Sequence, residues 1–333
     1  MSTCRVVRQR GIALILVLWI ITLLSLIALS FIATMRSEIN IVANTMNRAR
    51  AEAAANAGIQ RALFELARPP NAEGRWIADG TAQTLNYQDA SIRIVMTDET
   101  ARIDINTANP ELLRGLFLSQ GLSADGAAAL TDAIADWKDP DTLKRLNGAE
   151  EPEYIAAGLS YKPANAPFQS IEELNCVLGM TAALYARIAP LITVYSRQPG
   201  IYAQIAPREV LRAIPNVNDE QIELYLQQRD LARAGNAALP NFTPGTAYLS
   251  AGSGYVVRVQ AEAILPDGTH FTREAVARPL GNPRRPFTFL LWKEGRETLP
   301  PADIAAGRWT DAKAGPKAEG DVPAASDTTG QVR

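Results

Sequence analysis

Six carboxylates that could bind a metal ion lie within eighteen positions of one another near the middle of the sequence: Asp136, Asp139, Asp141, Glu150, Glu151 and Glu153. Clustered hard oxygen ligands suit Ca²⁺, which takes about six to eight oxygens. The spacing differs from that of an EF-hand loop, because Leu143 stands where a third ligand would be and no glycine follows it. From these residues alone, the stretch is either a solvated acidic loop or a cation site.

The histidine and cysteine content argues against the common catalytic arrangements. His270 is the only histidine, which excludes a His-cluster metal site and a catalytic triad built on several histidines. The two cysteines, Cys4 and Cys176, lie on opposite sides of the first apolar run, and the sequence contains no GxSxG motif. We therefore expect a protein that is not an enzyme and requires no cofactor for catalysis.

Charge gives no support to a nucleic-acid partner, since 33 basic side chains face 35 acidic ones. The segment GLSADGAAALTDAIADW superficially resembles a helix-hairpin-helix, in which backbone amides at a helix start bind DNA phosphates. It has no Lys or Arg until Lys138. A membrane-anchored periplasmic DNA-binding protein remains the alternative hypothesis for function.

The elements that must position these groups begin with a membrane helix. Residues 12–35 carry no charge, and as a helix they are long enough to cross a hydrocarbon core of about 30 Å. Arg5, Arg8 and Arg10 precede the run and predict a cytoplasmic N-terminus. A cleaved secretory signal would have an apolar core of only about 7–15 residues. The sequence therefore predicts a retained anchor with the rest of the chain on the opposite side of the membrane from the cytoplasm.

Helix-forming sequence continues past the apolar run through residues 36–68 and stops at Pro69. Its apolar residues recur at steps of three and four: Ala55, Ile59, Ala62, Leu63 and Leu66. We expect one helix from Ile12 to about Ala67, roughly 80 Å long, whose second half packs by one face onto a globular domain.

The rest of the chain mixes strand and helix patterns. Residues 90–106 predict two strands, residues 253–280 a hairpin, and residues 286–292 one more strand. Between them, residues 107–240 carry apolar residues at helical spacing. These patterns predict an α+β fold in which a helical insertion divides the strands of a small sheet.

The start of the sequence, RQRGIALILVLW, resembles that of a type IV prepilin. The resemblance implies that prepilin peptidase removes residues 1–11 by cutting after Gly11, and that the new N-terminal residue, Ile12, is N-methylated. Leu16 is then the fifth residue of the mature chain, where most pilins and pseudopilins carry glutamate. Their carboxylate pairs with the N-terminal amine of a neighbouring subunit. The apolar residue indicates a subunit at the tip of the fibre, with no neighbour above it.

Further along, ARIDINTANPELLRGL, ADWKDPD, GAEEPEY and YKPANAPFQSIEELNCVLGMTAALYARIAPLITVY follow one another in order. With the N-terminal pattern, they resemble the type II secretion minor pseudopilin K family over most of the chain, from about Arg8 to about Leu280. The resemblance implies a pseudopilin fold: a long N-terminal transmembrane helix, a small antiparallel sheet and a large inserted α-helical domain. It implies no catalytic residues, and the apolar residue at position 16 also follows the family's pattern.

The resulting domain organisation has five parts. The leader is 1–11, the long helix is 12–68, the pseudopilin α/β domain comprises 69–106 and 241–293, the inserted helical domain is 107–240, and the tail is 294–333. The tail is expected to be disordered because of its Ala, Gly, Pro, Asp and Lys content.

The resemblance also implies a function and partners. The protein would help initiate the type II secretion pseudopilus and export folded proteins across the outer membrane, lying in the inner membrane before assembly. Its partners would be the H, I and J minor pseudopilins, the major pseudopilin and prepilin peptidase, with exoproteins or the secretin as further contacts. Some members of the family bind calcium, which implies a structural Ca²⁺ held by Asp139, Asp141, Glu150 and Glu151.

Overall fold

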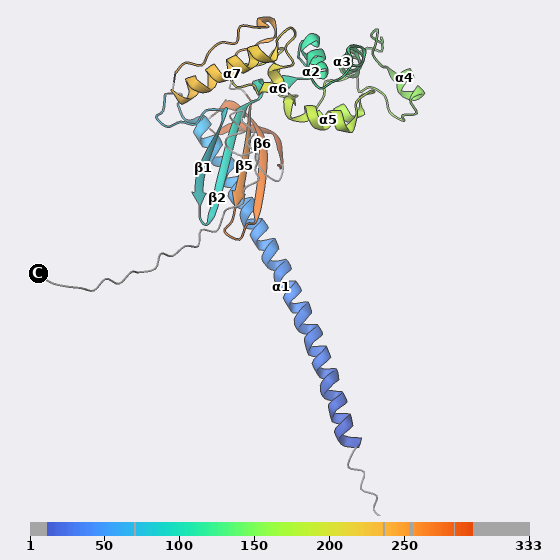
Figure 1. Cartoon of the computed structure of the whole chain (residues 1–333), viewed down its shortest axis with the longest axis vertical. Helices are drawn as coiled ribbons and strands as arrows, with labels where there is room; N and C mark the ends of the chain where they lie inside the picture. Colours follow the sequence, from blue (N-terminus) through green and yellow to red (C-terminus); the bar gives the residue numbers. More distant parts are fainter. Residues whose placement is uncertain (1–11, 70, 236, 253–255, 283, 296–333) are drawn as a thin grey trace, which may run out of the picture.

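The computed structural model describes residues 12–69, 71–235, 237–252, 256–282 and 284–295. A single helix, α1, runs over Ile12–Ala67 and ends just before Pro69, as predicted. Its large apolar side chains from Leu14 to Met46 are exposed, and its first fully buried residue is Ala51. Figure 1 shows this half of α1 projecting from one end of the molecule as an isolated rod.

A five-stranded antiparallel sheet covers the second half of α1 (Figure 1). Its order is β1-β2-β5-β6-β7. The strands are β1 (Asp79–Tyr87), β2 (Ala90–Asp98), β5 (Val257–Ile264), β6 (His270–Asn282) and β7 (Arg285–Glu294). The hairpin and the last strand agree with the sequence pattern. The edge strand β1 was not predicted, because its alternating residues are mostly polar and only partly buried.

The core between α1 and the sheet is built from the predicted helix stripe. Ala55, Ile59 and Ala62 are fully buried against inward-facing residues of β2 and β5. Gly58 lies at the closest approach, where an added Cβ would stand 2.8 Å from Ile92 and 3.0 Å from Ala261. Glycine is generally unfavourable inside a helix, but at this position it is what allows α1 to approach the sheet so closely.

A helical lobe stands between β2 and β5 in the chain and lies across the other end of the sheet (Figure 1). Its α-helices are α2 (Pro110–Ser119), α3 (Ala124–Lys138), α4 (Glu151–Ala156), α5 (Ala182–Ile188), α6 (Arg208–Leu211) and α7 (Asp219–Ala234). Its 3₁₀ turns are η1 (Glu99–Ala101), η2 (Ile171–Cys176), η3 (Ala189–Leu191) and η4 (Thr246–Tyr248). The lobe has its own apolar core, separate from that of the sheet. The predicted α+β fold with a helical insertion is therefore confirmed.

One predicted strand is used differently from the expectation. The pattern at residues 90–106 predicts two strands around a turn, but the second arm does not join the main sheet. It forms β3 (Ile103–Asp104), which pairs in parallel with β4 (Ile192–Thr193) in the lobe. The chain thus leaves the sheet at Asp98 and enters the lobe within five residues.

Candidate functional site

The free half of α1 is the largest apolar surface of the described chain. From Leu14 to Met46 its large apolar side chains are exposed, and Leu16 is 56% exposed. Among the described residues, one helix has the length and apolar composition to cross a membrane, and its apolar window has no buried residue. A surface of this kind requires lipid or other helices as its environment.

The helix is fixed where it leaves the sheet. The Arg48 guanidinium donates two hydrogen bonds to the Glu294 carboxylate of β7, at 2.8 and 2.9 Å. On the other side, Arg50 pairs with Asp89 in the turn between β1 and β2, at 2.5 Å. These exposed pairs add little stability individually, but they link both edges of the sheet to α1 at the same level. The rod therefore leaves the sheet in a defined direction.

The acidic loop follows α3. Asp139 is the C-cap of that helix, its Oδ2 pairs with Arg145 at 3.2 Å, and its Oδ1 is buried without a hydrogen-bond partner. Asp141 Oδ1 accepts a hydrogen bond from the backbone N–H of Leu143, at 2.8 Å. Leu143 thus contributes its backbone to the fold of the loop at the position where an EF-hand would need a ligand.

Glu150 is the most buried of the four predicted ligands. It precedes α4, is 4% exposed, and its Oε1 has no hydrogen-bond partner. Burial raises the pKa of Glu150, and the nearby carboxylates of Asp136, Asp139 and Asp141 raise that pKa further. The structure therefore brings three predicted ligands into one electrostatic neighbourhood. The fourth, Glu151, points to Lys162 at 3.2 Å and is largely exposed.

A cavity of about 710 Å³ lies beside these groups, lined by Glu150, Glu151 and Asn165 among others. Asn165 Oδ1 is a third buried oxygen without a partner. Carboxylate and amide oxygens are the kind of ligand that Ca²⁺ prefers, so the chemistry of these side chains suits the ion. The carboxylates do not form a chelating cluster, however. In the ranges described, no three His, Cys, Asp or Glu side chains gather closely enough to hold a metal ion.

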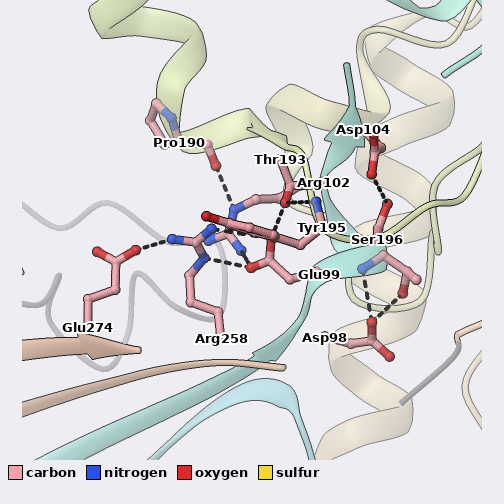
Figure 2. A network of polar contacts seen from close by, with 11 residues as sticks. Asp98, Glu99, Arg102, Asp104, Pro190, Thr193, Tyr195, Ser196, Arg258 and Glu274 are labelled. Atoms are coloured by element: carbon pink, nitrogen blue, oxygen red, sulfur yellow. Dashed lines mark hydrogen bonds and ion pairs between the residues drawn. The ribbon is translucent and has the colours of Figure 1, made fainter. Parts of the chain in front are cut away.

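A buried ion network joins the lobe to the sheet (Figure 2). Its centre is Glu99 in η1, which is fully buried. The Arg258 guanidinium of β5 donates to Glu99 at 2.6 and 3.2 Å, and Arg102 donates at 3.0 Å. From the lobe, the Thr193 hydroxyl also donates to Glu99. Arg258 bonds Glu274 of β6 as well, so one cluster ties two strands, the exit turn and the lobe.

The electrostatics of Glu99 follow from these partners. Burial alone raises the pKa of this carboxyl, but the charges of Arg258 and Arg102 more than offset burial and hold the pKa below its usual range. Burial and the charge of Arg258 together lower the pKa of Arg102 to about 10, although the charge of Glu99 acts in the opposite direction. Glu99 itself is fully buried among these partners, which hold the turn η1 to both the sheet and the lobe.

The segment considered for DNA binding forms α3. Ser123 caps that helix by accepting a hydrogen bond from the backbone N–H of Gly126, at 3.1 Å. The first turn of α3 carries Asp125 and no basic residue. A carboxylate at this helix start repels phosphate, so the structure gives no observation that favours the DNA-binding hypothesis.

Comparison with known proteins bears directly on this fold. The family model for "Type II secretion system (T2SS), protein K" matches residues 84–197. The type II secretion system protein K of Klebsiella pneumoniae is 30% identical over 205 residues, which cover 56% of this chain and 62% of that protein. The protein of the same name from Pseudomonas aeruginosa is 25% identical over 269 residues, covering 74% of this chain and 80% of its own length. These matches confirm the predicted resemblance to the type II secretion system protein K family.

The fold of the chain also agrees with a solved structure. A chain of the crystal structure of the GspK-GspI-GspJ complex from the enterotoxigenic Escherichia coli type 2 secretion system superposes with a TM-score of 0.53 and 18% identity. The similarity covers 78% of this chain and 99% of that one. The predicted fold, with a long N-terminal helix, a small antiparallel sheet and a helical insertion, is therefore confirmed.

Family resemblance and sequence pattern both missed some residues of the site. Asn165 contributes a buried oxygen, yet it lies within a proline-rich stretch without any ligand signal in its spacing. Asp136 faces the acidic loop, where Arg145 donates its backbone N–H at 3.2 and 3.3 Å, but was not chosen as a ligand. Gly11 lies outside the described residues, so its processing remains a prediction.

Proposed function

We propose that this protein is a minor pseudopilin at the tip of a type II secretion pseudopilus, where it helps initiate assembly and export of folded proteins. The observation that carries the proposal is the division of the molecule along α1. One end of α1 exposes an apolar rod, and the other end carries a broad helical lobe. The rod suits packing against the helices of sister subunits. The lobe is too broad for close packing in every layer of a shaft, so it fits the end.

The proposal extends to processing and topology. Prepilin peptidase would cut between Gly11 and Ile12, and α1 begins at Ile12. N-methylation of Ile12 and retention of the helix would follow. Before assembly the helix would span the inner membrane, with the sheet and lobe in the periplasm. The domain boundaries given above are proposed on the same basis, with 12–35 as the membrane span.

The proposed partners are the minor pseudopilins that correspond to the H, I and J components. The solved complex holds GspK with GspI and GspJ, which supports the I and J counterparts most directly. The exposed rod offers a contact surface outside the membrane as well: Ile39, Ile41, Val42 and Met46 are each more than half exposed on α1. A water-facing helix with these side chains needs a partner helix.

Co-purification of the full chain with its I and J counterparts from membranes tests the proposal. We expect a stable complex, and we expect Val42→Arg to weaken it because a charge is then placed on the apolar helix face. Glu38→Gln, on the same exposed stretch, is the matched control. Retention on DNA that falls with salt, without any pseudopilin in the complex, would instead support the DNA-binding alternative.

Leu16 is proposed as a tip-specific apolar position. Leu16→Glu should reduce secretion severalfold, because a carboxylate with no amine to pair with is unfavourable inside a membrane helix. Leu16→Ile keeps the apolar character and should secrete normally. The measurement is the amount of exoprotein in the medium at equal levels of each variant. Normal secretion by Leu16→Glu would contradict the tip assignment.

We also propose a structural Ca²⁺ in the acidic loop. Asp139, Asp141 and Glu150 would hold the ion, with Asn165 as an additional oxygen and Glu151 released from Lys162. The buried oxygens without partners support this set. The ion would neutralise carboxylates that otherwise repel one another, and it would thereby order the connection between α3 and α4. Its role would be structural, and it would take part in no chemical reaction.

Calcium should raise the melting temperature of the full chain by about 5–10 °C at a concentration near one hundred times Kd. Glu150→Gln should remove this rise.

Without calcium at pH 7, Glu150→Gln should have a higher melting temperature than the wild type. The raised pKa of Glu150 means that ionisation destabilises the fold above that pKa, and this cost vanishes below the unfolded pKa. Glu111→Gln, an exposed position on α2, is the control. Identical melting of wild type with calcium and with chelator would refute the site.

A further inference from the structure

A second cavity lies away from the acidic loop, between the sheet and the lobe. Its volume is about 450 Å³. The sheet contributes Val95 and Thr97 of β2 and Gln260 of β5. Strand alternation places these side chains on the sheet face opposite α1, because their neighbours Ile94 and Val259 pack on the helix. The other wall is formed by α6 and α7, which lie over the end of β1 in Figure 1.

The wall from α7 presents one helix face. Leu226, Arg229 and Arg233 line the cavity at steps of three and four residues. Arg229 is 5% exposed, and its Nη1 donates to the carbonyl of Ala206 at 2.7 Å. Arg233 donates through Nη2 to the carbonyl of Gln204 at 3.1 Å. Both guanidiniums therefore have a defined position.

Each of these arginines keeps a donor without an acceptor. The Nε–H groups of Arg229 and Arg233 are buried and have no hydrogen-bond partner among the described residues. Arg208 of α6 lines the same cavity, and its Nε–H is also buried without a hydrogen-bond partner among the described residues. Its Nη1 pairs with Glu223 at 2.5 Å. Buried donors without acceptors are unfavourable, and three of them at one cavity require an explanation.

The charge around the cavity points to an anion. Four arginines and two acids, Asp79 and Glu209, line it. Arg102 and Arg208 are already paired with Glu99 and Glu223, whereas Arg229 and Arg233 donate to backbone carbonyls. Burial lowers the pKa of Arg229, and the charge of Arg233 lowers it further. Mutual repulsion of this kind is relieved by a bound negative group.

The remaining lining is apolar and includes Val95, Ala101, Ile205 and Leu226. An anion with an apolar carbon chain would therefore fill the space better than a bare inorganic ion. Guanidinium groups match carboxylates in geometry through paired N–H donors. We propose that this cavity binds a carboxylate carried on a short apolar chain, either a free small carboxylate or an acidic side chain of a polypeptide.

Calorimetric titration of the full chain in detergent with glutarate tests the proposal, with sodium chloride at equal ionic strength as the reference. We expect saturable binding of glutarate. Arg208→Gln and Arg233→Gln should each weaken it at least tenfold, and Arg233→Lys should weaken it less than Arg233→Gln does. Arg212→Gln is the matched control, because Arg212 follows α6, pairs with Asp219 and does not line the cavity. It should change glutarate affinity less than twofold.

Two further arms identify the source of the carboxylate. A short peptide with one central glutamate is compared with the same peptide carrying glutamine. Tighter binding of the glutamate peptide than of glutarate supports a polypeptide ligand, and the reverse order supports a free carboxylate. Circular dichroism confirms folding of each variant. If Arg233→Gln does not fold, Arg208→Gln decides the test.

Three results would overturn the proposal. The first is the absence of saturable glutarate binding above the salt reference. The second is an equal loss of affinity in Arg208→Gln and Arg212→Gln, which would indicate a general effect of charge. The third is binding of inorganic phosphate as tight as that of glutarate, which would remove the assignment to a carboxylate. None of these results depends on assembly of a pseudopilus. The proposed ligand of the cavity and the proposed function of the protein can therefore be refuted independently.

Discussion

Glu99→Ala should lower the melting temperature of the full chain by about 10 °C or more. Removing one partner of a buried ion pair costs about 3–5 kcal/mol, because the other charge is left uncompensated. Each kcal/mol corresponds to about 2–4 °C for a domain of roughly 150–250 residues. In this protein Arg258 and Arg102 would both lose the Glu99 carboxylate as a partner. The hydroxyl of Thr193, which lies in the lobe, would lose the same carboxylate as its hydrogen-bond acceptor.

The pH dependence of the same variant gives a second readout. Because the pKa of Glu99 is held below its unfolded value, the network contributes stability above the unfolded pKa and loses it as pH falls through the folded pKa. The difference in melting temperature between wild type and Glu99→Ala should therefore be full at pH 7 and shrink under acid conditions. A difference that is constant with pH would contradict an ionic origin.

Glu111→Ala is the matched control for Glu99→Ala. Glu111 also faces an arginine three residues away, Arg114, but both side chains are substantially exposed and lie 3.7 Å apart. Exposed pairs of this kind contribute about 0–1 kcal/mol. Equal destabilisation by the two variants would show that the buried network does not hold the lobe on the sheet.

Gly58→Leu should also destabilise strongly, by about 1–3 kcal/mol or more, through overpacking. Even a single Cβ at Gly58 would stand 2.8 Å from Ile92 Cγ2 and 3.0 Å from Ala261 Cβ. A leucine would force α1 away from the sheet, since the Ala261 Cβ cannot rotate aside. The unfolding midpoint in denaturant measures the effect.

Ala49→Leu provides the comparison on the same helix. Ala49 is exposed, so added methyl groups meet no neighbour within the chain. We expect an unfolding midpoint close to that of wild type. Unfolding of Gly58→Leu at the same denaturant concentration as Ala49→Leu would contradict the close packing of α1 on β2 and β5.

The parts of the fold that sequence predicts are those determined by local pattern. The stripe of Ala55, Ile59 and Ala62 repeats at helical spacing, and each residue is buried where the pattern places it. The hairpin of β5 and β6 has alternating residues around a turn formed by residues 266–268. Such signals lie within one or two elements of the chain, so they can be read without knowing the tertiary structure.

The parts that sequence does not predict depend on contacts between distant segments. Glu99 meets Thr193 and Arg258, which lie 94 and 159 positions further along the chain. No spacing rule connects these residues. Similarly, Ile103 has the pattern of a sheet strand, yet its partner is Ile192 in the lobe. The acidic loop is intermediate, because its carboxylates are close in sequence but the oxygen of Asn165 is not.

The mass of the mature chain tests most directly whether the N-terminal helix is retained for assembly. Intact mass spectrometry of the protein purified from membranes, with fragmentation of its N-terminal peptide, is the measurement. We predict a chain that begins at Ile12, carries one N-methyl group and lacks residues 1–11. An intact Met1, or a cut beyond the apolar run that removes the helix, would contradict the assignment as a pseudopilin.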